Sequence, residues 1–341
     1  MKKLKTIDWY IITLVMAVIS AVSLRTYALS NSFNDVTKYY ENSLASTICN
    51  IILVVGVLIF VSYIFLGEKD HELLANNDNA ATYIPAGIVS AALLFMGIER
   101  FNSIPAVGEA TPLIRTLSIL TAVLAILSVA SFFVSIFIEK KHSIYKASFS
   151  LSVVFFLALY ASLLFFSTNG HPTNSPNRIL DQMTYLFAAT FFLFETRIHL
   201  GRAKWRLYVA FGLAATLLCF TSAIPSIVMY FVDGYLVSAS IIESALSLTL
   251  AIFIASRVFQ SRDLTPDAEC DVAQSISALA ALREEEIKKQ RSLAHAHEDN
   301  NVETESTQDS SNYTFDIPYV DPSVDLNPDG ADIDLSKESD D

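Results

Sequence analysis

Apolar residues along this chain fall into eight long runs separated by polar segments. The runs cover residues 7–24, 46–66, 82–98, 113–138, 147–167, 179–195, 207–232 and 236–258. Each run is about 17–26 residues long, which lets an α-helix cross a bilayer, whereas a strand of a membrane barrel needs only about 9–11. The pattern therefore predicts an all-α polytopic membrane protein, built as a bundle of about eight transmembrane helices.

The polar segments between the runs differ in their lysine and arginine content, and this difference predicts the orientation. Residues 139–146, EKKHSIYK, form a short lysine-rich connection, and such connections stay on the cytoplasmic side. The inner segments then hold thirteen basic residues, Lys2, Lys3, Lys5, Lys69, Lys140, Lys141, Lys146, Arg197, Arg202, Lys204, Arg206, Arg257 and Arg262. The outer segments hold five, Arg25, Lys38, Arg100, Arg115 and Arg178. Both termini are therefore expected in the cytoplasm, in a multi-pass protein of the cell (plasma) membrane.

The first run could also be read as a signal peptide, because lysines precede it and small residues follow it. Asp8, Trp9 and Tyr10 at its start are more typical of an anchor at the membrane interface. We therefore expect a membrane helical domain over residues 1–262 that begins with a true span.

The chain after the last run changes character twice. Thr265 and Pro266 give a helix-start signal, and apolar residues then recur at helical spacing, which predicts a cytosolic amphipathic helix over 263–296. Residues 297–341 hold fourteen aspartates and glutamates against one lysine, so the net charge of the whole chain, −12, comes from this segment, whose own net charge is −13. Such a composition buries too little apolar surface to fold, and we expect a disordered acidic C-terminal tail.

One apolar segment interrupts the acidic tail. Its alternating apolar residues could pair with a cytosolic protein partner as an added strand. The simpler alternative is a chance apolar island in a solvated tail. The residues of this candidate partner-binding motif are Tyr313, Phe315, Ile317, Tyr319 and Val320.

Six polar residues lie within the outer half of the predicted spans or at their outer edge. They are Asn50, Glu99, Arg100, Arg115, Asp181 and Glu243. Glu243 is the deepest charge, about seven residues into its run and so on the order of 10 Å down. A carboxylate at that depth must be paired, protonated or in contact with a wet site. Arg115 is the expected partner, with Arg100 or Arg178 next, and the six residues form either an outward-facing polar site or a structural ion pair.

Motifs of enzymes are missing from the sequence. It contains no nucleotide-binding loop, no zinc motif and no G-x-S-x-G elbow, and Cys49, Cys219 and Cys270 lack the spacing of metal ligands. This disfavours an enzyme and predicts no cofactor and no metal site. The inner charges Glu195, Arg197 and His199 are interpreted as an ordinary membrane edge.

The function is therefore narrowed to two hypotheses. The first is a non-enzymatic membrane sensor or scaffold, which lies in membrane lipid and recruits a cytosolic partner through its tail. The alternative is a permease or small-molecule-binding membrane protein that uses the outer polar residues. No segment has the pattern of a nucleic-acid-binding surface.

Overall fold

The computed structural model describes residues 6–34, 37–41, 43–67, 80–104, 111–137, 144–166, 175–200, 204–234, 237, 240–261 and 288. These belong, apart from residue 288, to a compact unit within Met1–Asp271. The predicted cytosolic helix over 263–296 and the predicted tail over 297–341 lie outside the described residues, apart from the single helical residue Lys288.

The eight predicted membrane helices are all present, and the all-α fold class is confirmed. They are α1 (Thr6–Ser32), α2 (Leu44–Leu66), α3 (Ala80–Asn102), α4 (Pro112–Phe137), α5 (Ile144–Phe166), α6 (Pro176–His199), α7 (Trp205–Val232) and α8 (Ile241–Gln260). Within the described segments, seven of them are long and apolar enough to cross a membrane. The other is α6, which carries charged residues at both ends, among them Asp181 and Glu195. The chain is therefore a multi-pass membrane protein.

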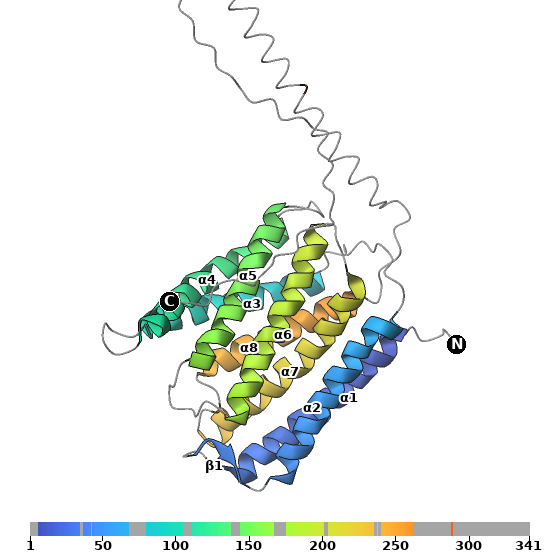
Figure 1. The fold of residues 1–341 in the computed structure, drawn as a ribbon, viewed down its shortest axis with the longest axis vertical. Helices are drawn as coiled ribbons and strands as arrows, with labels where there is room; N and C mark the ends of the chain where they lie inside the picture. Colours follow the sequence, from blue (N-terminus) through green and yellow to red (C-terminus); the bar gives the residue numbers. More distant parts are fainter. Residues whose placement is uncertain are drawn as a thin grey trace, which may run out of the picture. The chain divides into compact units, whose positions relative to one another are not determined.

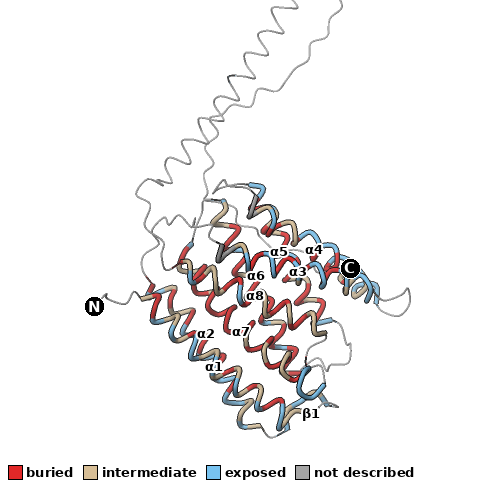
Figure 2. Tube along the Cα trace, turned by 180° about the vertical axis from the view of Figure 1, so that it is seen from behind, coloured by how far each residue is buried: buried red, intermediate tan, exposed pale blue. Residues whose placement is uncertain are grey.

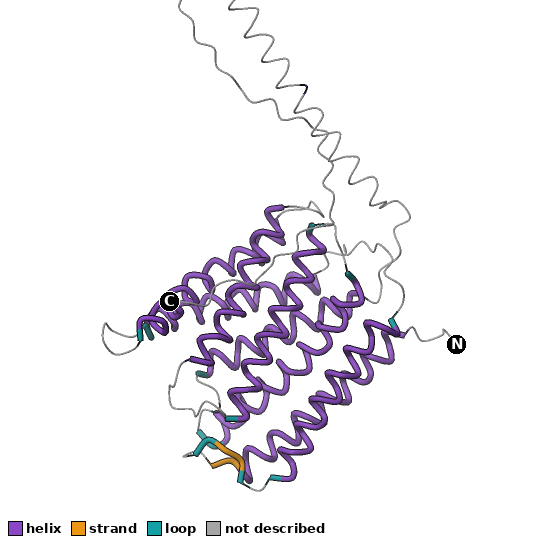
Figure 3. Tube along the Cα trace, in the orientation of Figure 1, coloured by secondary structure: helices purple, strands orange, loops and turns teal. Residues whose placement is uncertain are grey.

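Six of the helices close into a ring (Figures 1 and 3). Helix α3 packs against α4, and the contacts continue through α5, α6, α7 and α8 back to α3. Helices α1 and α2 form a pair at one edge, where both pack against α7. Because consecutive ring helices run in opposite directions, the end of α3 and the beginnings of α4, α6 and α8 come to the same end of the ring.

The chain between the first two runs differs from the prediction. A polar loop was expected from residue 25, but α1 continues to Ser32 and is followed by a short antiparallel pair, β1 (Phe33–Asn34) and β2 (Tyr39–Tyr40). No proline or glycine interrupts residues 25–32, so nothing in the chain ends the helix earlier. Arg25 consequently lies within α1 and is buried.

Burial is highest in α7, the ring helix against which the α1–α2 pair packs (Figure 2). The large apolar side chains that stay exposed lie on several helices, for example Phe65 and Phe231. Exposed apolar surface of this extent is unusual for a monomeric soluble protein and is what a bilayer covers.

Gly212 lets α7 approach its neighbours closely. A Cβ at this position would lie 2.5 Å from Cγ2 of Val258 and 3.1 Å from the ring of Phe191, and both neighbours are buried. We expect Gly212→Ala to lower the free energy of unfolding by about 1–3 kcal/mol, because neither neighbour has room to move. Gly87→Ala is the matched control, since a Cβ there meets nothing within 4 Å. Thermal unfolding in detergent measures both, and equal stability of the two variants would contradict the close packing.

Candidate functional site

Helix α8 begins later than the sequence predicted, and this places Glu243 in its first turn. Ser240 is the N-cap, and its hydroxyl accepts a hydrogen bond from the backbone N–H of Glu243 at 3.1 Å. The expected position seven residues into the helix is therefore wrong. Its neighbours are nevertheless deep, since Tyr160 and Tyr185 lie about 9 and 13 Å along α5 and α6 from the nearer ends of those helices. Helix α8 thus starts inside the bundle.

The carboxylate of Glu243 is enclosed by the ring. The residue is 1% exposed, and neither carboxylate oxygen has a hydrogen-bond partner within the described segments. The hydroxyl of Tyr160 lies close to this carboxylate without reaching hydrogen-bond geometry. Tyr185 packs edge-on to Tyr160 with 4.9 Å between ring centroids, and its hydroxyl donates to the backbone carbonyl of Glu243 at 3.3 Å. The site therefore joins a buried carboxylate to two aromatic rings.

Arg100, rather than Arg115, is the cation that acts on Glu243. The charged side chains around Glu243 are Asp181, Arg100 and Glu99. Nη2 of Arg100 donates to the hydroxyl of Tyr160 at 2.5 Å, and its guanidinium lies over the Tyr160 ring, 4.9 Å from the centroid. Among the described residues no ion pair joins Arg115 to Glu243, so the expected pairing is wrong and the second choice, Arg100, takes its place.

The structure brings together four of the six predicted polar residues. We call Glu99, Arg100, Asp181 and Glu243, with the tyrosines between them, the outer polar cluster. The hydroxyl of Ser240 donates to Oε2 of Glu99 at 3.0 Å, and the hydroxyl of Ser222 donates to Oδ1 of Asp181. Arg115 lies half-buried at the same end of the ring. Asn50 is exposed on α2, which packs against α1 and α7 rather than in the ring.

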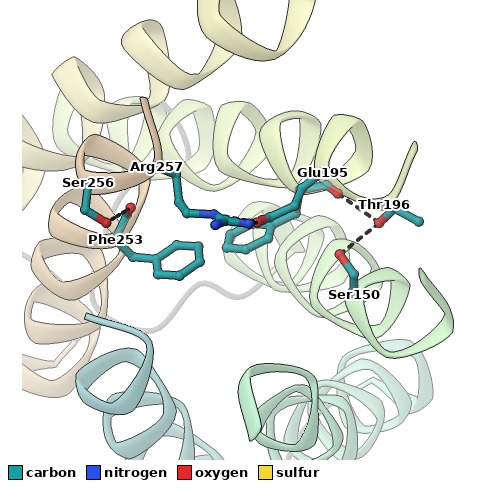
Figure 4. Close-up of polar contacts among 7 residues, drawn as sticks. Ser150, Glu195, Thr196, Phe253, Ser256 and Arg257 are labelled. Carbon is teal, nitrogen blue, oxygen red and sulfur yellow. Dashed lines mark hydrogen bonds and ion pairs between the residues drawn. The ribbon is translucent and has the colours of Figure 1, made fainter. Parts of the chain in front are cut away.

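A second polar contact lies at the opposite end of the ring (Figure 4). Arg257 of α8 donates through Nε and Nη2 to Oε1 of Glu195 on α6, at 3.0 and 2.8 Å. Beside it, the hydroxyl of Thr196 donates to that of Ser150 at 2.9 Å. Glu195 is buried, so its interpretation as an ordinary membrane edge is wrong. Arg257 lies in the last turn of α8, 62 residues after Glu195 in the chain. Only the three-dimensional arrangement identifies it as the partner of Glu195.

Between these two ends, three phenylalanines meet at the centre of the ring. Phe132 of α4, Phe192 of α6 and Phe253 of α8 lie with 5.2–6.0 Å between ring centroids. Phe192 follows Tyr185 by seven residues, about 10 Å along α6, and Glu195 lies about 5 Å further on. The ring interior thus carries a polar layer, an aromatic layer and an ion pair in succession.

No three histidine, cysteine, aspartate or glutamate side chains come together as metal ligands anywhere in the described segments. None of the protein-family models, curated proteins or solved structures compared with this chain matches it.

Proposed function

We propose that this membrane protein binds a small cationic ligand at Glu243, as a permease or a small-molecule-binding membrane protein would. The observation that carries the proposal is the Glu243 carboxylate, which is 1% exposed and makes no hydrogen bond through either oxygen to any described residue. A buried carboxylate in this state costs several kcal/mol, and a ligand that supplies positive charge and N–H groups removes that cost.

The surroundings of Glu243 also suit a cation. Asp181 and Glu99 add negative potential, whereas Arg100 is the one guanidinium among the strongest charges acting there. Aromatic rings attract cations through their faces, and Tyr185 lies beside the carboxylate, next to the Tyr160 ring over which the Arg100 guanidinium lies. The late start of α8 leaves this position inside the bundle, which is where permeases place their ligands between broken helices.

Sodium, potassium and methylammonium are suitable probes of this site. We expect at least one to raise the melting temperature of the purified protein by about 4 °C or more at saturation, at constant ionic strength balanced with N-methylglucamine. Glu243→Gln removes the charge that attracts the cation and should abolish the rise. Glu41→Gln, at an exposed carboxylate, is the matched control and should retain it. A wild-type protein that responds to none of the three, or a Glu243→Gln protein that responds fully, would contradict the proposal.

A sensor or scaffold role remains the second candidate. It is supported by the acidic composition of residues 297–341 and by the apolar segment around Tyr313 and Tyr319, all of which lie outside the described residues. Deleting residues 266–341 distinguishes the two functions. A small-molecule-binding protein keeps its cation response without these residues, whereas a scaffold loses its cytosolic partner.

We also propose that the protein is oriented in the membrane with its lysine-rich connections in the cytoplasm. Asp233 ends α7 and Lys204 precedes it, and both are exposed. In a protein freed of its natural cysteines, we expect a membrane-impermeant maleimide to label Asp233→Cys in intact cells and Lys204→Cys only after the membrane is opened. The reverse pattern would place the termini outside.

A further inference from the structure

A second unsatisfied charge lies at the outer end of α1. Arg25 is 6% exposed, and its Nη2 donates to Oδ1 of Asn177, the second residue of α6, at 2.9 Å. Among the described residues its Nε has no acceptor, and no carboxylate forms an ion pair with it. Arginine stays protonated at any accessible pH. The one hydrogen-bond partner of this buried cation in the described segments is thus a neutral amide, which does not balance its charge.

The Asn177 amide has a defined orientation. Its Oδ1 accepts from Arg25 and also from the hydroxyl of Tyr40 at 2.7 Å. Burial raises the pKa of the Tyr40 hydroxyl, with the charge of Arg25 acting in the opposite direction, so this hydroxyl remains a donor. Oδ1 is thus occupied by two donors, whereas Nδ2 has no acceptor within the part of the chain that the structure describes, although Asn177 is 2% exposed.

The beginning of α6, beside Arg25 and Asn177, lacks a side-chain cap. Ser175 is the N-cap of this 24-residue helix, but its side chain makes no capping hydrogen bond, because its hydroxyl donates to the backbone carbonyl of Lys38 at 3.1 Å. A helix beginning presents N–H groups and the positive end of the helix dipole. Arg25 and the Asn177 amide thus lie together at the uncapped beginning of α6, and each has one N–H without an acceptor among the described residues.

We infer that this point is a binding site for a phosphate-type oxyanion, held by Nε of Arg25, Nδ2 of Asn177 and the beginning of α6. An oxyanion supplies both the counter-charge and the acceptors that these groups lack, and arginine and helix beginnings are the usual protein partners of phosphate. The phosphate belongs either to an anionic lipid headgroup or to free inorganic phosphate. The site is separate from Glu243 and does not depend on the cation proposed there.

Two measurements distinguish free inorganic phosphate from a lipid headgroup as the bound oxyanion. In detergent, inorganic phosphate is expected to raise the melting temperature by about 4 °C or more at saturation if the ligand is free phosphate. In nanodiscs, phosphatidylglycerol is expected to raise it by a similar amount over phosphatidylcholine if the ligand is a lipid. Arg25→Gln should abolish whichever response is seen, and Arg197→Gln, an arginine at the far end of α6, should retain it. If neither phosphate source stabilises the wild type, or if Arg25→Gln responds as the wild type does, the inference is overturned.

Asn177→Asp tests the site without removing the arginine, so it decides the question even if Arg25→Gln does not fold. The new carboxylate keeps both hydrogen bonds to Oδ1 and provides the missing counter-charge from within the chain. We expect this variant to melt higher than the wild type without phosphate and to lose the response to phosphate or phosphatidylglycerol. A variant that melts lower and still responds would overturn the site.

Discussion

Replacing Arg100 by methionine is expected to lower the free energy of unfolding by about 3 kcal/mol, near the lower limit for removing one partner of a buried charge pair. The guanidinium is the cation that acts on the enclosed Glu243, and Glu99 and Asp181 would then repel that carboxylate without opposition. The Tyr160 hydroxyl would also lose its hydrogen bond from Nη2. The loss stays at the low end because Arg100 is only half-buried and makes no direct hydrogen bond to Glu243.

The double variant Arg100→Met/Glu243→Gln should recover part of that loss, with a coupling energy of about 1–3 kcal/mol between the two positions. Arg115→Met is the matched control, because this arginine lies at the same end of the ring without pairing to Glu243. Its effect should add to that of Glu243→Gln within about 0.5 kcal/mol. Denaturant unfolding of the three single and two double variants measures both cycles. Coupling through Arg115 instead of Arg100 would contradict the geometry of the outer polar cluster.

Breaking the ion pair at the other end of the ring should cost as much or more. Arg257→Met leaves the Glu195 carboxylate, whose side chain is 6% exposed, without its charged donor, and we expect a loss of about 3–5 kcal/mol. Glu195→Leu should cost somewhat less, because the Arg257 side chain is 18% exposed and water reaches it. Both values refer to unfolding in detergent.

Replacing both partners, as Glu195→Leu/Arg257→Met, should restore stability to within about 1 kcal/mol of the wild type, since apolar residues of similar volume often replace a buried pair without loss. Arg197→Met is the control on the same helix and should stay within about 0.5 kcal/mol. A double variant as unstable as Arg257→Met alone would indicate that the two residues do not act as a pair.

The helices could be predicted from sequence because the thickness of the bilayer fixes their length. Every apolar run became a helix, and seven of these helices meet the requirements for spanning. The ends of the helices were harder to predict from sequence, because they depend on local caps and on neighbouring elements. The run over 236–258 contains no break, yet Ser240 caps α8 and the helix begins at Ile241. Similarly, α1 runs on to Ser32, directly before β1, because no proline or glycine ends the helix earlier.

The composition of the site was predictable, but its internal contacts were not. In a membrane the faces toward lipid and toward protein are both apolar, so the sequence pattern does not reveal how a helix is rotated. Asn50 looked like a member of the cluster and lies exposed on α2. Arg100 rather than Arg115 acts on Glu243 because α3, which carries Arg100, packs against α8, which carries Glu243. The sequence does not show which helices are neighbours in the ring. Arg25 looked like a loop residue until α1 was seen to continue past it.

The most direct measurement of the proposed function is the reactivity of Glu243 itself in the intact membrane. Dicyclohexylcarbodiimide partitions into membranes and reacts with carboxyl groups in apolar surroundings, and mass spectrometry locates the adduct. We predict an adduct on Glu243 that decreases when the cation that stabilises the protein is present, and no adduct at this position in Glu243→Gln. A Glu243 that stays unmodified, or that is modified equally with and without cations, would contradict a ligand site and leave a closed structural cluster.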